Sequence, residues 1–413
     1  MDLTVIPSRL QGEVTPPASK SMAHRALIAA ALTGRGTSIL HNLASSRDIQ
    51  ATCRCLSALG ARIEEVEPGT VRVSHGLGAA IVEAGPAPIL DCGESGSTLR
   101  FLIPVALALR GGGKFTGHGR LMERPQEPYF AIFREKGISY EQRDGVLTVR
   151  GRLSPGDYTL PGDVSSQFVT GLLYALPLLE GDSRILLTTP LESRGYIDMT
   201  LDALEQFGVR AAYDGDRTFR VPGNQSYRPR DLTIEADWSN AAFWYAAQFV
   251  GCDLEIGGLN AFSTQGDMRI VPYFVKLQGK GPVDLDVSQC PDLVPPLAAM
   301  AALRGGETTR IVNAARLRIK ESDRLATVTE VLNALGGRVE EHEDHLVIHG
   351  MDHLAGNVTV SGHNDHRIAM MAAIAAIRCQ GPVTITGAEC VKKSYPDFWE
   401  DYRSLGGRYT CDT

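Results

Sequence analysis

The feature that most constrains the fold of this chain is an internal repeat. Each copy consists of an amphipathic helix that ends in a glycine, an alternating apolar strand, a polar turn and a second alternating strand. Glycine after a helix favours a left-handed C-cap, so each of these glycines marks a corner between a helix and a strand. The copies have their glycines at Gly60, Gly137, Gly208 and Gly336, and a truncated copy has Gly406.

The spacing of these glycines gives the length of one unit. The separations are 137 − 60 = 77, 208 − 137 = 71, 336 − 208 = 128 and 406 − 336 = 70 residues. The separation of 128 is nearly two periods, and a degraded copy, Val275-Lys276-Leu277-Gln278-Gly279, lies inside it. Because repeats of this kind stack to bury a shared core, we expect six α/β units of about seventy residues.

The best linker candidate is the polar stretch 222–230, which contains two prolines. Clusters of proline, glycine and polar residues between periodic segments are typical of loops. This stretch divides the six units into two sets of three, so we expect two lobes. A ligand between two such lobes would be enclosed when they close, which excludes water from reactive groups.

Length and charge limit the class of protein. A chain of 413 residues exceeds one typical hydrophobic core, which agrees with two lobes. The formal net charge of −7 argues against a nucleic-acid partner and against an anionic membrane held by bulk electrostatics. The eight cysteines are scattered without a C-x-x-C pair or a histidine at metal-ligand spacing. We therefore expect reduced thiols and no metal site.

The sequence shows neither a membrane span nor a secretory signal. Its longest apolar runs, 26–32 and 368–377, have the length of buried helices and are too short to cross a bilayer. The first residues lack the basic start and the apolar centre of a signal peptide. We therefore expect a cytoplasmic protein without a membrane partner.

Residues 16–34 are the first candidate for a binding site. Two prolines, a serine able to cap, an alanine- and leucine-rich run and a closing glycine are typical of a loop that enters a helix near Ser21. Lys20 then lies at the start of the helix, and Arg25 lies on the face of Ser21 within about one turn. A helix N-terminus already favours an anion, so the segment predicts half of a phosphate or carboxylate site. An ordinary solvated helix start explains the same residues equally well.

Further short stretches place cations, hydroxyls or carboxylates beside glycines or at expected helix starts. They are Gly93–Arg100, Glu123–Pro125, Ser165–Gln167, Ser193–Tyr196, Lys320–Arg324, Asn364–Arg367 and Lys392–Asp397. Each stretch taken alone also fits an ordinary cap or turn. Arg124 is expected in an extended segment, because proline disfavours helix at the residue before it. Cations at helix starts in both halves favour a substrate with more than one anionic group.

The stretch Lys320–Arg324 is the most specific of these. On a helix, Lys320 and Arg324 would be i,i+4 neighbours of like charge, which is destabilising unless a negative group lies between them. Glu321 could be that group. A plain surface ion pair remains an alternative.

Taken together, these motifs resemble those of the 5-enolpyruvylshikimate-3-phosphate (EPSP) synthase family, the 3-phosphoshikimate 1-carboxyvinyltransferases. The resemblance spans nearly the whole chain, and its motifs occur in the family's order. The segments that carry it are Pro17–Arg25, Gly96–Arg100, Glu123–Pro125, Lys320–Arg324, Asn364–Arg367 and Lys393–Asp397. Several motifs in agreement are far more specific than any one of them.

The resemblance implies an α/β (α+β) enolpyruvyl transferase fold with two lobes, each of three βαβαββ units in an inverse α/β barrel. One lobe would hold residues 1–18 and 229–413, and the other residues 19–228. The implied reaction transfers the enolpyruvyl group of phosphoenolpyruvate to the 5-hydroxyl of shikimate 3-phosphate and releases phosphate, in the shikimate pathway to chorismate and aromatic amino acids. No metal or organic cofactor is required, and we expect a monomer.

The resemblance also assigns site residues through the matching motifs. Those for shikimate 3-phosphate are Lys20, Ser21, Arg25, Ser165, Ser166, Gln167, Ser193, Tyr196, Asp292 and Lys320. Those for phosphoenolpyruvate are Lys20, Gly96, Arg124, Gln167, Arg324, Arg367 and Lys393. The candidates for proton transfer are Lys20, Asp292, Glu321, His366 and Lys393.

The chemistry of the reaction agrees with these residue types. Two highly charged substrates need several fixed cations, and the planar fork of arginine suits phosphate and carboxylate. The methylene carbon of phosphoenolpyruvate gains a proton while the hydroxyl loses one, so a positioned acid and a base are needed. Glu321 could carry the carbon proton and Asp292 could accept the hydroxyl proton, but the sequence does not decide which candidate moves which proton.

Two alternatives stay open at this stage. The related transferase that acts on UDP-N-acetylglucosamine generally has a reactive cysteine in the loop before its arginine-proline motif, and residues 117–125 contain none. A binding protein of the same fold without catalysis would have no need of both Asp292 and Glu321. Glu94 and Arg316 stand where other members of the EPSP synthase family carry asparagine, so neither is included in the expected site.

Overall fold

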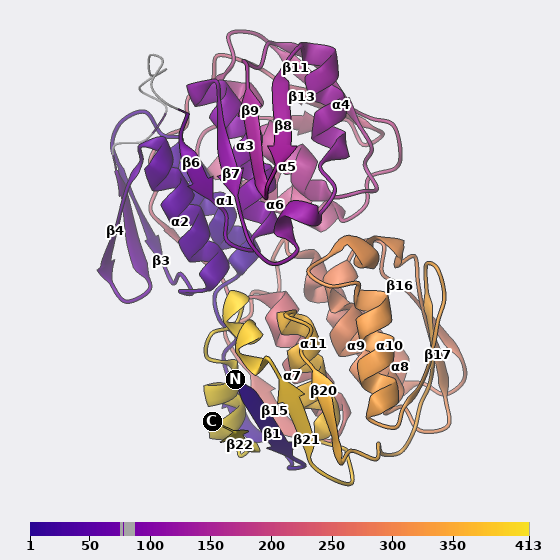
Figure 1. Ribbon diagram of the computed structural model, residues 1–413. Helices are drawn as coiled ribbons and strands as arrows, with labels where there is room; N and C mark the ends of the chain where they lie inside the picture. Colours follow the sequence, from indigo (N-terminus) through magenta and orange to yellow (C-terminus); the bar gives the residue numbers. More distant parts are fainter. Residues whose placement is uncertain (75–76, 78–86, 413) are drawn as a thin grey trace. The chain divides into compact units, whose positions relative to one another are not determined.

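The computed structural model describes residues 1–74, 77 and 87–412 (Figure 1). The chain forms two compact units, each with its own hydrophobic core. The terminal unit consists of Met1–Pro17 and Ala236–Thr413, and the inserted unit is Ala18–Glu235. The sequence placed the two boundaries after residues 18 and 228. In the structure the chain enters the inserted unit after Pro17 and leaves it after Glu235.

The inserted unit contains three four-stranded sheets of the same design. In the sheet ordered β6-β7-β9-β8, the first two strands are parallel and the last two form an antiparallel hairpin. The sheets β10-β11-β13-β12 and β14-β3-β5-β4 repeat this order. The helices are α1 (Lys20–Ala31), α2 (Arg47–Leu59), α3 (Gly96–Arg110), α4 (Glu127–Lys136), α5 (Ser166–Ala175) and α6 (Arg194–Gln206). The strands are β3 (Thr37–His41), β4 (Arg62–Glu67), β5 (Thr70–Ser74), β6 (Ile89–Asp91), β7 (Gly112–Thr116), β8 (Ser139–Arg143), β9 (Val146–Arg150), β10 (Gly156–Leu160), β11 (Ser183–Leu187), β12 (Ala212–Tyr213), β13 (Thr218–Val221) and β14 (Leu232–Thr233).

Strand β14 explains where the inserted unit ends. It pairs in parallel with β3, with Leu232 opposite Leu40 and Thr233 opposite His41. It therefore takes the place of the first strand in the sheet whose other strands come from the start of the unit. For this reason residues 229–235 belong to the inserted unit.

The terminal unit repeats the design with modifications. The sheet β16-β17-β19-β18 has the same order, and in the sheet β20-β21-β1-β22 the N-terminal strand β1 takes the third place. The strands β2 and β15 form a parallel pair without a hairpin. The strands are β1 (Asp2–Ile6), β2 (Gln11–Val14), β15 (Asp253–Ile256), β16 (Val283–Asp286), β17 (Thr308–Val312), β18 (Arg338–Glu341), β19 (Leu346–His349), β20 (Val358–Ser361), β21 (Val383–Thr386) and β22 (Arg408–Asp412). The helices are α7 (Trp238–Phe249), α8 (Ile270–Gln278), α9 (Val294–Ala302), α10 (Arg324–Ala334), α11 (His366–Ala376) and α12 (Phe398–Ser404).

The glycines that mark the repeat in the sequence lie at the helix-to-strand corners, as predicted. Gly60 and Gly137 are left-handed C-caps of α2 and α4, with φ of 114° and 68°. Gly208, Gly336 and Gly406 also have positive φ, at 79°, 96° and 89°. The degraded copy differs, because its glycine, which follows α8, has an extended backbone with φ of −68°.

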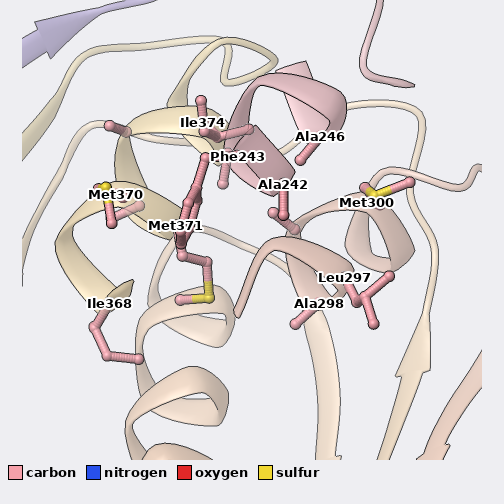
Figure 2. Packing of buried hydrophobic residues seen from close by; sticks show 14 of the residues in the cluster. Ala242, Phe243, Ala246, Leu297, Ala298, Met300, Ile368, Met370, Met371 and Ile374 are labelled. Carbon is pink, nitrogen blue, oxygen red and sulfur yellow. The ribbon is translucent and has the colours of Figure 1, made fainter. Parts of the chain in front are cut away.

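Helices α7, α9 and α11 form the centre of the terminal core. Helix α7 contacts both other helices, with Ala242 on the side of Leu297 of α9 and Phe243 on the side of Met371 of α11 (Figure 2). These side chains are fully buried. Alanine-rich helices can approach one another closely, and the larger Phe243 and Met371 fill the remaining space between them. None of the helices in the described ranges is long and apolar enough to cross a membrane.

Replacing Phe243 with alanine is expected to destabilise the terminal unit by about 3–5 kcal/mol, because the cavity cannot collapse among helices packed on all sides. The three tryptophans of the chain, Trp238, Trp244 and Trp399, all lie in this unit. Their fluorescence during urea unfolding therefore measures the terminal unit alone. Phe262→Ala is the matched control, because the Phe262 side chain is 95% exposed, and its effect should stay within about 0.5 kcal/mol. Equal effects of the two substitutions would contradict the packing described here.

Candidate functional site

Several helices of the inserted unit begin at residues that the sequence predicts for the site. Helix α1 begins at Lys20, one residue before the expected start, and Ser19 is its N-cap. The Lys20 ammonium lies 2.9 Å from the Asp48 carboxylate on α2, and the side chains are 15% and 12% exposed. Lys20 is therefore a half-buried cation at a helix N-terminus, where the helix dipole adds to its attraction for an anion.

Arg25 is buried on the next turn of α1, at 3% exposure. Its Nε donates to Thr200 Oγ1 at 2.9 Å, and its Nη1 and Nη2 donate to the carbonyl oxygens of Ser21 and Tyr196 at 2.7 and 2.8 Å. Phe101 packs on the guanidinium, with its ring centroid 5.3 Å away. Burial lowers the pKa of Arg25, but an arginine remains charged at neutral pH. The fold thus fixes a positive charge and its orientation.

Gly96 and Arg124 lie in direct contact. Gly96 is the first residue of α3, and Ser95 caps that helix by accepting from the N–H of Thr98. The backbone of Arg124 is extended, as predicted from the following proline. A Cβ atom on Gly96 would lie 2.6 Å from Nη1 of Arg124. The absence of a side chain at position 96 therefore allows the buried guanidinium to lie against the N-terminus of α3.

The start of α5 carries three further predicted residues. Ser165 is the N-cap, and its hydroxyl accepts from the N–H of Gln167 at 3.3 Å. Ser166 is the first helical residue and is buried. The side chain of Gln167 accepts from Arg100 Nη1 at 2.9 Å and donates to Ser97 at 3.0 Å. These bonds fix which end of the Gln167 amide is the donor.

Helix α6 completes the group in the inserted unit. Its N-cap Ser193 is buried and has a left-handed backbone, with φ of 55°. The ring of Tyr196 lies 6.0 Å from the Arg25 guanidinium. The starts of α1 and α6 are thus linked through Arg25, whereas the start of α5 contacts Arg100 and Ser97. The inserted-unit group comprises Lys20, Ser21, Arg25, Gly96, Arg124, Ser165, Ser166, Gln167, Ser193 and Tyr196.

In the terminal unit, Asp292 connects three predicted cations. It lies in a short 3₁₀ helix, Pro291–Leu293. Its Oδ1 accepts from Lys320 Nζ at 3.3 Å and from Arg324 Nη1 at 2.9 Å, and its Oδ2 accepts from Arg367 Nη2 at 3.2 Å. The terminal-unit group comprises Asp292, Lys320, Glu321, Arg324, His366, Arg367 and Lys393.

The predicted helical spacing of Lys320 and Arg324 is wrong. Helix α10 begins only at Arg324, because Asp323 caps it by accepting from the N–H of Ala326. Lys320 instead follows the 3₁₀ helix Ala315–Ile319 and has an extended backbone. The negative group between the two cations is Asp292, which both of them contact. Glu321, the group suggested by the sequence, pairs with Arg324.

Arg324 is the most enclosed cation of the terminal-unit group, at 1% side-chain exposure. It donates to Glu321 Oε2 at 2.9 Å and, through Nε, to Asp365 Oδ2 at 2.8 Å. Burial alone would lower the pKa of Arg324, but Asp365, Glu321 and Asp292 outweigh it, and the pKa is raised. Burial lowers the pKa of Lys320, and Asp292 partly opposes this shift.

Helix α11 places the remaining residues. Asp365 caps it by accepting from the N–H of Arg367 at 3.0 Å, and His366 is its first residue and is buried. Lys393 lies at the end of the 3₁₀ helix Ala388–Lys393, and its ammonium donates to the carbonyl oxygen of Asn364. The fold therefore gathers cations around the start of α11 and leaves Asp292 and Glu321 within the same group.

Three residues outside the predicted set hold members of it in place. Asp48 pairs with Lys20, Asp365 pairs with Arg324, and Arg100 holds Gln167. Asp365 and Arg100 lie within the stretches singled out in the sequence, but nothing there gives their partners. Among the described residues, no group of three or more His, Cys, Asp or Glu side chains is placed to hold a metal ion.

Comparisons with known proteins identify the family of this chain. A family model for EPSP synthase (3-phosphoshikimate 1-carboxyvinyltransferase) matches residues 5–402. The chain belongs to the EPSP synthase family. A 3-phosphoshikimate 1-carboxyvinyltransferase from Clostridium kluyveri is 48% identical over 98% of this chain and 97% of its own length. The enzyme of that name from Clostridium beijerinckii is 44% identical over 98% of both chains.

Solved structures support the fold of an EPSP synthase family member. The EPSP synthase of Acinetobacter baumannii superposes with a TM-score of 0.81 and 25% identity, over 100% of both chains. The enolpyruvyl transferase NikO of Streptomyces tendae gives a TM-score of 0.78 at 19% identity, over 99% of this chain and 98% of its own, which supports the two-lobed fold alone.

Proposed function

We propose that the inserted-unit group and the terminal-unit group bind shikimate 3-phosphate and phosphoenolpyruvate for the reaction of the EPSP synthase family. The chain is a 3-phosphoshikimate 1-carboxyvinyltransferase. It transfers the enolpyruvyl group of phosphoenolpyruvate to the 5-hydroxyl of shikimate 3-phosphate and releases phosphate, in the shikimate pathway to aromatic amino acids. The proposal assigns residues to the binding of each substrate and to the transfer of protons.

Shikimate 3-phosphate is assigned to hydroxyls and cations at the helix starts of the inserted unit, together with two residues of the terminal unit. The fixed charge of Arg25 and the N-termini of α5 and α6 support this assignment, because phosphate oxygens need several donors at once. The residues are Lys20, Ser21, Arg25, Ser165, Ser166, Gln167, Ser193, Tyr196, Asp292 and Lys320.

Phosphoenolpyruvate is assigned to residues that combine arginine forks with lysine charges. The contact between Gly96 and Arg124 supports this assignment, because it joins a helix N-terminus to a guanidinium. The residues are Lys20, Gly96, Arg124, Gln167, Arg324, Arg367 and Lys393.

For proton transfer, the proposal assigns Glu321 to the methylene carbon of phosphoenolpyruvate and Asp292 to the attacking hydroxyl. The Glu321 side chain is 21% exposed and contacts Arg324, so it combines access to a ligand with a fixed orientation. Lys20, His366 and Lys393 are proposed to orient the reacting groups and to share in moving the protons. The observation that carries the assignment is the placement of both carboxylates around one buried arginine.

Phosphate release from phosphoenolpyruvate tests this proposal. Release is expected with shikimate 3-phosphate in one reaction and not with UDP-N-acetylglucosamine in another. Asp292→Asn keeps the size of the side chain but should lose most release, because the amide cannot accept the hydroxyl proton. Its NH2 group also cannot accept from the cations that contact both Asp292 oxygens. Undiminished release by this variant would remove Asp292 from the chemistry, and release with the nucleotide sugar alone would overturn the substrate assignment.

The lowered pKa of Lys320 gives a pH prediction. Only the protonated ammonium attracts the anionic substrate, so kcat/KM for shikimate 3-phosphate should fall on the alkaline side, at a pH below the value of about 10.4 usual for lysine. Lys320→Arg should move this fall to higher pH, because arginine stays charged. The measurement is a pH profile of kcat/KM for both enzymes. An alkaline limb that stays in place in Lys320→Arg would assign the titration to another group.

We also propose that the chain acts as a monomer in the cytoplasm. The test is light scattering coupled to gel filtration, which should give the mass of one chain, 44.6 kDa. A mass twice as large would replace the monomer with a dimer.

A further inference from the structure

A chain of buried hydroxyls connects three helices of the inserted unit. His24 Nδ1 on α1 lies 2.7 Å from Thr52 Oγ1 on α2. Thr52 Oγ1 lies 2.7 Å from Thr98 Oγ1 on α3, and Thr98 Oγ1 donates to Ser95 Oγ at 2.7 Å. All four residues are at most 1% exposed. None of them belongs to the residues assigned above to the substrates.

The direction of these bonds follows from counting protons. A hydroxyl has one proton to donate. Thr98 gives its proton to Ser95, so it must accept from Thr52. Thr52 then has no proton left for His24, so the imidazole must donate through Nδ1–H. His24 therefore carries a proton on Nδ1, while its buried Nε2 has no hydrogen-bond partner among the described residues.

Charge and burial agree with a neutral imidazole. Burial lowers the pKa of His24 well below its usual value, and the nearby cations Lys20 and Arg25 lower it further. The ring of Phe101 meets the imidazole edge-on, with centroids 6.4 Å apart. His24 thus remains an uncharged donor at the pH of the cytoplasm and gives the chain of hydroxyls a single direction.

Both ends of this chain lie beside groups assigned to phosphoenolpyruvate. At one end, Ser95 caps α3, whose first residue is Gly96. At the other, His24 is one turn from Lys20 on α1. Asp48, one turn before Thr52 on α2, holds the Lys20 ammonium with its carboxylate. The hydroxyls therefore fix the distance between the N-terminus of α1 and that of α3.

We propose that His24, Thr52, Thr98 and Ser95 form a positioning relay that sets Lys20 and Gly96 at the spacing that phosphoenolpyruvate requires. These residues act through others and do not touch the substrate. The inference rests on the proposed assignment of Lys20 and Gly96 to phosphoenolpyruvate. It predicts that loss of one hydroxyl affects the affinity for one substrate and not for the other.

Thr98→Val tests the relay, because valine keeps the shape of threonine and removes only the hydroxyl. KM for phosphoenolpyruvate should rise by about tenfold, the factor that corresponds to one lost hydrogen bond of ordinary strength. KM for shikimate 3-phosphate should change by less than about twofold. Thr98→Ser should restore both values, and Thr52→Val should resemble Thr98→Val. The double variant should be no worse than either single one, because the relay is already broken.

Two matched variants separate positioning from stability. Thr33→Val removes a buried hydroxyl that bonds to the carbonyl oxygen of Ala30 at the far end of α1, and it should change neither KM. Thr200→Val removes the acceptor of Arg25 Nε, so it should raise KM for shikimate 3-phosphate instead. If Thr98→Val lowers the melting temperature and leaves both KM values unchanged, or raises both equally, the relay is overturned.

Gly96→Ala distinguishes failure of the positioning relay from failure of the assignment of Gly96 to phosphoenolpyruvate. Its methyl group would meet the Arg124 guanidinium, so KM for phosphoenolpyruvate should rise. If Gly96→Ala raises this KM and Thr98→Val does not, the relay alone fails. If Gly96→Ala leaves it unchanged, the assignment of Gly96 fails. Nitrogen NMR of the histidine side chains adds a direct readout: the Nδ1–H tautomer of His24 supports the relay, and the Nε2–H tautomer overturns it.

Discussion

Replacing Glu321 with glutamine is expected to lower kcat by about 10²–10⁴-fold, the usual contribution of a positioned proton-transfer group. Glutamine has nearly the same shape, and its side-chain oxygen can still accept from Arg324, as Glu321 Oε2 does at 2.9 Å. It cannot carry a proton to the methylene carbon. Turnover should therefore be lost while both substrates still bind, which steady-state kinetics and calorimetric titration with shikimate 3-phosphate would measure.

The control for this variant is Glu330→Gln. Glu330 lies on α10 with a side chain that is 64% exposed, and it pairs with His363 at 3.2 Å. The same change of charge there should leave kcat within about twofold of the parent enzyme, as expected for a surface substitution. Near-normal turnover by Glu321→Gln would exclude Glu321 from proton transfer. A loss of binding that matched the loss of turnover would instead assign it to holding the substrate.

The repeat could be predicted because its signals are local. A glycine after an amphipathic helix needs only its own φ to form the corner, and Gly60 and Gly137 both take the left-handed conformation. A strand that completes a sheet from a distant part of the chain, such as β14, could not be predicted in this way. Strand β14 pairs with β3 across most of the inserted unit, and two residues, Leu232 and Thr233, carry too little pattern to reveal a partner.

In the candidate site too, local features could be predicted from the sequence and long-range contacts could not. Helix starts such as those at Lys20 and Gly96 follow from caps and small residues nearby in the sequence. The helical spacing of Lys320 and Arg324 was wrong because α10 begins only after Lys320: Asp323 is its N-cap, and Ser322 bonds to Asp365 instead. Partners of buried cations are set by tertiary structure: Asp365 lies 41 residues from Arg324 in the sequence.

Replacing Arg25 with alanine is expected to weaken the binding of shikimate 3-phosphate by at least about 30-fold, since loss of one partner of a buried charged hydrogen-bonded pair costs about 2–5 kcal/mol. Three of its five N–H groups are used by Thr200, Ser21 and Tyr196. Within the described part of the chain, two N–H groups therefore remain for a phosphate. Calorimetric titration with shikimate 3-phosphate would measure the loss, and the affinity for phosphoenolpyruvate should change much less.

Two further variants decide whether the charge or its orientation matters at Arg25. Arg25→Lys keeps a cation but cannot satisfy three acceptors and still present two parallel donors, so its affinity should lie between those of the parent and the alanine variant. Arg54→Ala removes an exposed arginine of the same unit, paired with Asp91 at 3.5 Å, and should leave the affinity unchanged. If Arg25→Ala bound shikimate 3-phosphate as tightly as the parent, Arg25 would serve only to join α1 to α6. The phosphate would then have to be held by the hydroxyls at the starts of α5 and α6 without it.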